Sequence, residues 1–71
     1  MKAVEVFTTN VQEVSQANYL MTIIVKIFPD YSVNFDLEDR DRILRVKSDL
    51  IDSKAIINIM TSRNFTCEVL E

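Results

Sequence analysis

Residues 31–47 read YSVNFDLEDRDRILRVK, two alternating segments on either side of a charged stretch. In residues 31–37 every second side chain is apolar, and in residues 42–47 Leu44 and Val46 alternate with basic residues. A period of two residues is typical of a strand with one buried face. Residues 38–41 are all charged, so we expect a solvated turn there, although it lacks the usual glycine. The stretch therefore predicts a β-hairpin.

The segment before the hairpin has the period of a helix over residues 11–28. Asn10 is the expected N-cap, with Glu13 three residues later able to complete a capping box. Pro29 ends the helix because it has no amide hydrogen and disfavours a helical residue before it. Counted at 100° per residue, the expected core face carries Val14, Ala17, Met21, Ile24, Val25 and Phe28.

A strand is expected at residues 3–8, where Val4 and Val6 alternate with Glu5 and are predicted to face the core. Phe7 interrupts that alternation.

A second helix is expected over residues 54–63, capped by Asp52 or Ser53. Asn64 then takes the left-handed conformation that glycine usually takes at a helix end. Residues 65–70 form the last strand, with Cys67 on its apolar face. The core face of this second helix carries Ile56, Ile59 and Met60.

The order of the expected elements is β-α-β-β-α-β. Both crossovers run through a helix, and right-handed crossovers place the two helices on the same side of one sheet. We therefore expect a single α+β domain over residues 1–71, a ferredoxin-like βαββαβ sandwich. It has a four-stranded antiparallel sheet with two helices on one face. A chain of 71 residues is too short for a second domain.

The composition excludes most catalytic and metal chemistry. With no histidine, one cysteine and no glycine, a single chain cannot build a Cys–His zinc cluster, an imidazole-based nucleophile or a glycine-rich phosphate loop. The net charge of −3, with basic residues scattered among acids, argues against nucleic acid. No apolar stretch has the length of a bilayer span or the pattern of a signal peptide. We expect a cytoplasmic protein that is not an enzyme and uses no cofactor, nucleic acid or membrane.

Several stretches together resemble a known family. Residues 28–38 (FPDYSVNFDLE), 43–46 (ILRV) and 63–70 (RNFTCEVL) are similar to the later strands of heavy-metal-associated domains, the small copper-chaperone fold. The resemblance covers essentially the whole chain, with Asn-Phe where the family has Gly-Tyr or Gly-Phe. That family binds soft metals through a Cys-x-x-Cys motif at the entry to the first helix. The resemblance places either Gln12 and Ser15 or Val14 and Ala17 at these positions, so it implies a degenerate metal site.

Other candidate metal ligands have simpler interpretations. A single thiol cannot form a tight soft-metal site alone, and Cys67 is expected to be buried as a small hydrophobe. Met21 and Met60 are expected to fill the core. The acids around the turn lack the glycine of a calcium loop and lie beside two arginines. These acids are Asp36, Glu38, Asp39 and Asp41.

The first helix carries more apolar residues than one packing face needs, with eight of ten in residues 19–28. Tyr19 and Ile23 project towards its polar side, and Ile27 lies at the margin. Either these residues form a partner surface, or the core face is wide and Tyr19 covers its rim. We expect a non-catalytic interaction or regulatory domain that binds a protein or a second copy through these three residues. The alternative is residual copper or zinc handling through Cys67 in a dimer.

Overall fold

The alternating segments form the predicted hairpin in the computed structural model, which describes residues 2–71. β2 (Ser32–Asp36) and β3 (Ile43–Ser48) pair in an antiparallel register. Side chains replace glycine in stabilising the turn between them, since Oδ1 of Asp39 accepts a hydrogen bond from the Asp41 N–H at 2.8 Å. The hairpin prediction is confirmed.

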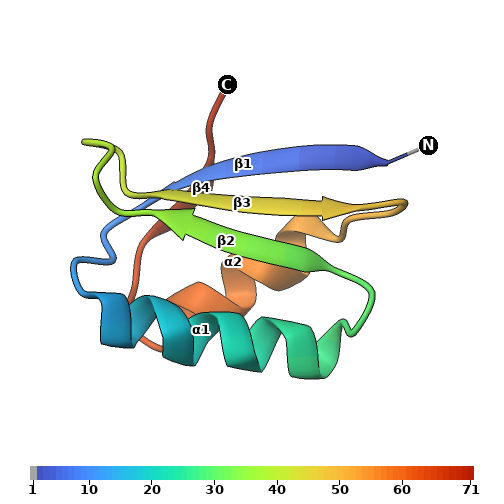
Figure 1. The fold of residues 1–71 in the computed structure, drawn as a ribbon, viewed down its shortest axis with the longest axis horizontal. Coiled ribbons are helices and arrows are strands. Elements are labelled where there is room, and N and C mark those ends of the chain that lie inside the picture. Colours follow the sequence, from blue (N-terminus) through green and yellow to red (C-terminus); the bar gives the residue numbers. More distant parts are fainter. Residues whose placement is uncertain (1) are drawn as a thin grey trace.

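β1 (Ala3–Thr9) and β4 (Cys67–Val69) complete a four-stranded sheet in the order β2-β3-β1-β4, and every neighbouring pair is antiparallel. α1 (Val14–Ile27) and α2 (Ser53–Thr61) lie on the same face of this sheet (Figure 1). α1 packs beside β2, and α2 packs beside β4. The chain order is β1-α1-β2-β3-α2-β4, so the protein is an α+β domain, consistent with a ferredoxin-like fold.

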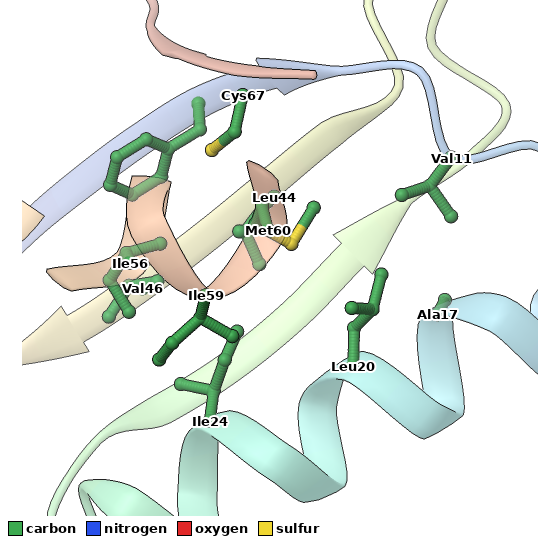
Figure 2. Close-up of a cluster of buried hydrophobic side chains, with 11 residues drawn as sticks. Val11, Ala17, Leu20, Ile24, Leu44, Val46, Ile56, Ile59, Met60 and Cys67 are labelled. Carbon is green, nitrogen blue, oxygen red and sulfur yellow. The ribbon is translucent and has the colours of Figure 1, made fainter. Parts of the chain in front are cut away.

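The core lies between the two helices and the face of the sheet that they cover (Figure 2). It draws on β1, β3, β4, both helices and the loop before α1, whereas Val33 and Phe35 of β2 are only half-buried. The predicted core face of α2 is confirmed. The buried cluster comprises Phe7, Val11, Ala17, Leu20, Ile24, Leu44, Val46, Ile56, Ile59, Met60 and Cys67.

Polar groups stabilise the two ends of α2. Oδ1 of Asp52 accepts a hydrogen bond from the Ala55 N–H at 3.0 Å, which confirms one of the two expected caps. Oγ of Ser53 donates to a carboxylate oxygen of Glu5 at 2.8 Å, and a negative charge is favourable at a helix N-terminus. After the helix, Asn64 has the expected left-handed conformation, with φ of 69°.

The face predicted for β1 is wrong. Phe7 and Thr9 are buried on the helix side of the sheet, whereas Val4 and Val6 belong to the alternate set on the open side, and Val4 is 49% exposed. An aromatic ring buries more apolar area than a valine, so the strand gains more by turning Phe7 inward. The hydroxyl of Thr9 is satisfied there because it donates to the Arg42 carbonyl.

α1 begins at Val14, later than predicted, because Glu13 is its N-cap. Oε1 of Gln16 accepts a hydrogen bond from the Glu13 N–H at 3.1 Å. The predicted cap, Asn10, has a different role. Its Oδ1 accepts from the Thr66 N–H at 2.9 Å and so joins the loop before α1 to the residue before β4.

The buried face of α1 is also rotated from the predicted one. Ala17, Leu20 and Ile24 are its buried residues, whereas the predicted members Val14 and Val25 are 67% and 40% exposed. Apolar residues occur on nearly every side of this helix, so their periodicity does not fix which side faces the sheet. Contacts with β2 and α2 decide the rotation.

Replacing Leu20 by alanine should lower the free energy of unfolding by about 2–5 kcal/mol, because it leaves a cavity beneath α1. Val25→Ala, on the exposed flank of the same helix, should change it by less than about 0.5 kcal/mol. Urea denaturation of both variants and the parent measures the difference. Equal losses would contradict the observed rotation of α1.

Candidate interaction surface

An apolar groove lies between the first half of α1 and the end of β2. It has a volume of about 350 Å³. Most of its apolar surface comes from side chains of α1 and from Phe35 and Leu37, and two acids stand where β2 leads into the turn. We call it the α1–β2 groove. It is lined by Val14, Ala17, Asn18, Met21, Phe35, Asp36, Leu37 and Glu38.

The groove exists because β2 is an edge strand. No further strand covers its outer side, so the flank of α1 beyond β2 stays uncovered. Val14, Met21 and Val25 share this flank, since residues seven and eleven positions apart lie on one side of a helix. Met21 and Val25 also line an adjoining hollow with Thr22 and Lys26. The apolar surface therefore extends along most of α1.

The residues predicted to bind a partner lie on the other flank of α1. Tyr19 is 56% exposed and Ile27 is 53% exposed, whereas Ile23 is half-buried and packs against the core. Helical spacing places these three residues on one stripe, separated from Val14 and Val25 by the buried face. Two flanks of the helix are thus apolar, and the hollowed one is the flank beside β2.

Sequence reasoning missed the hollowed flank because it assigned Val14, Met21 and Val25 to the core. Nothing in the helix alone distinguishes the two flanks. The expected ferredoxin-like topology holds the one available signal, because the second strand of that topology lies at an edge of the sheet. A helix beside an edge strand has one flank that no strand covers.

Charged side chains line both the groove and the adjoining hollow. Asp36 and Glu38 are exposed at the end of β2, and Lys26 is exposed in the last turn of α1. Within residues 2–71 the one ion pair joins Lys2 and Asp49, at 4.0 Å on the surface. Glu38 and Lys26 are thus outside any ion pair of the described residues, whereas Oδ1 of Asp36 accepts a hydrogen bond from the Glu38 N–H at 3.2 Å.

Arg42 fixes the acidic end of the groove. Its φ of 49° is left-handed, and Nη1 donates hydrogen bonds to the carbonyls of Leu37 at 2.9 Å and Gln12 at 3.4 Å. Thr8 of β1 also binds the turn, since its hydroxyl donates a hydrogen bond to the Asp41 carbonyl at 2.9 Å. The turn is thus held to both β1 and the loop before α1.

The positions that the family resemblance assigns to metal-binding thiols lie around this end of α1. Val14 and Ala17 line the groove, and Gln12 and Ser15 are exposed. The described part of the chain, residues 2–71, has no group of three or more His, Cys, Asp or Glu side chains placed to hold a metal ion. The entry to α1 thus combines the apolar groove lining of Val14 and Ala17 with the exposed polar side chains of Gln12 and Ser15.

Cys67 is 4% exposed in the core. Burial, with a smaller contribution from the charge of Glu68, raises the pKa of its thiol from 9.0 to about 12. The thiol is therefore protonated at neutral pH, and the thiolate is the form that binds metals and attacks electrophiles.

Comparisons of the chain with protein-family models, curated proteins and solved structures found no significant match. The resemblance to heavy-metal-associated domains therefore stays a prediction. Neither helix within residues 2–71 has the length and apolar content needed to cross a lipid bilayer.

Cys67 should react slowly with iodoacetamide in the folded protein. Because the pKa rises from 9.0 to about 12, the thiolate fraction at pH 8 falls about a thousandfold relative to the unfolded chain. We expect native alkylation to be at least about a hundredfold slower than alkylation in guanidinium chloride. Mass spectrometry measures both rates, and equal rates would show that Cys67 is accessible and ionised.

The same shift makes stability depend on pH. Between pH 9 and about 12 the unfolded chain loses the thiol proton while the folded protein keeps it, so the free energy of unfolding should fall as pH rises. Cys67→Ala is the matched control, and its loss over this range should be smaller.

Proposed function

We propose that this chain is a non-catalytic protein-interaction domain with the ferredoxin-like βαββαβ topology, and that the α1–β2 groove is its binding surface. The observation that carries the proposal is the continuity of the groove with exposed apolar side chains along α1. Val14 and Val25, 67% and 40% exposed, extend the apolar lining that Met21 and Phe35 begin. Contiguous exposed apolar groups typically mark protein-binding surfaces.

The ferredoxin-like assignment is supported by the order of the elements and by the pairing of the strands. In the strand order β2-β3-β1-β4, β3 lies between β1 and β2, and β1 lies between β3 and β4. Each connection through a helix therefore crosses one strand. Every strand pair is antiparallel, and both helices cover one face (Figure 1). These features support a split βαβ arrangement.

The non-catalytic interpretation is supported by what the polar groups do. The chain has no histidine to serve as a base. The buried polar residues are Thr9 and Ser48. Thr9 has a structural role, since its hydroxyl donates to one backbone carbonyl and accepts from the Val11 N–H at 3.2 Å. Cys67 is the buried thiol, and burial keeps it protonated.

The resemblance to heavy-metal-associated domains fits this proposal. If Val14 and Ala17 occupy the positions of the family's thiols, then apolar contact has replaced metal binding at the entry to the first helix. We infer that the domain retains the scaffold of a metallochaperone without its metal site. Copper or zinc handling through Cys67 in a dimer is the less favoured function, because the thiol lies in the core and is protonated.

Val25→Glu should weaken binding of a protein partner at least about tenfold, because it places a charge on the apolar flank beside β2. Asn58→Glu, at an exposed position of α2, is the matched control and should leave binding unchanged. Each variant is immobilised, the proteins it retains from cell extract are quantified by mass spectrometry, and native mass spectrometry records self-association. Circular dichroism checks that each variant is folded.

Tyr19→Glu tests the other flank of α1 in the same experiment. Loss of binding in Tyr19→Glu alone would show that the partner binds Tyr19, Ile23 and Ile27 and not the α1–β2 groove. Identical retention by the parent and Val25→Glu, without any loss of self-association, would refute the role of the α1–β2 groove.

A further inference from the structure

The sheet has two unpaired edges, and they differ in their capacity to pair with another strand. β4 has three residues, whereas β2 has five. Natural edge strands are usually protected by short length, by lysine or by proline. The β2 sequence, SVNFD, contains neither lysine nor proline, and its one charge is at the last residue. β2 is therefore the edge better suited to accept a strand.

A strand added to β2 would also cover the α1–β2 groove. Alternate residues of β2 face the helix side, where Val33 and Phe35 are half-buried. A neighbouring strand would bring its own alternate side chains over these two residues and over the uncovered flank of α1. The added strand would then form hydrogen bonds with the backbone of β2 and also cover the apolar groove beside it.

The sequence of β2 is self-complementary in an antiparallel arrangement. Centring two copies on Asn34 pairs all five residues and keeps the helix-side residues of both copies on one face. Val33 of each copy then lies opposite Phe35 of the other, an apolar pairing that favours a sheet. Ser32 lies opposite Asp36, so no two like charges face each other.

The charges at the two ends of β2 also match across such a pair. The final end of β2 is acidic on balance, since four acids in residues 36–42 outnumber two arginines. Lys47 stands near the first end of β2 because it pairs with Ser32. Lys26 lies in the last turn of α1. The end of α1 leads into that same first end of β2 (Figure 1). The antiparallel arrangement brings the basic end of one copy to the acidic end of the other, which favours and orients association.

One acid at the first end of β2, Asp30, weakens this match without cancelling it. Lys2 lines the same cavity as Asp30 but forms its ion pair with Asp49. Lys26 and Lys47 outnumber Asp30 at this end of β2.

We propose that the partner of the α1–β2 groove is a second copy of this chain, bound by antiparallel pairing of the two β2 strands about Asn34. The two sheets join into one, and the two α1 helices lie side by side on the same face. This inference rests on the proposed function, since it names the partner for that surface.

Disulfide trapping tests the pairing directly. Residues directly opposite in an antiparallel pair have Cα atoms about 4.5–5.5 Å apart, within the roughly 4.4–6.8 Å that a disulfide spans. Asn34→Cys should therefore form a covalent dimer with oxidised glutathione, whereas Asn58→Cys, exposed on α2, should not. Cys67 is buried and does not compete. Failure of Asn34→Cys to form more covalent dimer than Asn58→Cys would overturn the proposal.

A charge exchange tests the orientation of the two copies. Lys26→Glu and Glu38→Lys should each weaken dimerisation about fivefold, because each breaks two symmetry-related charge contacts at the surface. The double variant should return to within about twofold of the parent, since each contact is restored with its signs reversed. Sedimentation equilibrium over a concentration series measures the dissociation constants. Additive losses in the double variant would refute this orientation.

The two proposals fail separately. If the parent chain stays monomeric in sedimentation and Asn34→Cys gives no disulfide-linked dimer, then a second copy is not the partner of the groove. If Val25→Glu still loses a protein that the parent retains from extract, the groove remains an interaction surface for a different protein. A dimer that forms but gives no trapping at Asn34 uses another surface and also overturns the pairing.

Discussion

The structure depends on covering one face of a four-stranded sheet with two short helices. Phe7, Leu44 and Val46 present that face, and Leu20, Ile24, Ile56 and Met60 close over it. Apolar burial is the main favourable contribution to folding, and a chain of 71 residues has little of it to spare. α1 packs against the edge strand β2 and against α2. The same placement leaves its outer flank and the β2 edge uncovered, so the demands of the core create the groove.

The hairpin and α2 could be predicted because local and tertiary preferences agree there. Alternation in β2 and over residues 44–47 of β3 allows one choice of buried face. Asp52 and Asn64 mark the two ends of α2 by their own backbone and hydrogen-bonding preferences. The element order followed from these signals together with Pro29. In physical terms, the sequence is informative where only one arrangement buries the apolar residues and satisfies the polar ones.

β1 and α1 show where such reasoning fails. β1 carries apolar residues on both faces, and a threonine can be buried when its hydroxyl has a partner, as that of Thr9 has. α1 is apolar on three sides, so its rotation is set by the shape of the sheet beneath it. The groove combines that rotation with residues from beyond β2, and its lining could not be read from either segment alone. Cys67, by contrast, was correctly predicted to be buried, because a lone thiol on an apolar strand face has no chemical partner.

Arg42 links the absence of glycine to the properties of the groove. A left-handed residue other than glycine is energetically unfavourable, yet here the guanidinium holds the carbonyls of Leu37 and Gln12 and so fixes the turn against the entry to α1. The acidic end of the groove is consequently preorganised. A partner that binds there orders little of this chain, because the conformational entropy that mobile loops usually lose on association has already been lost on folding.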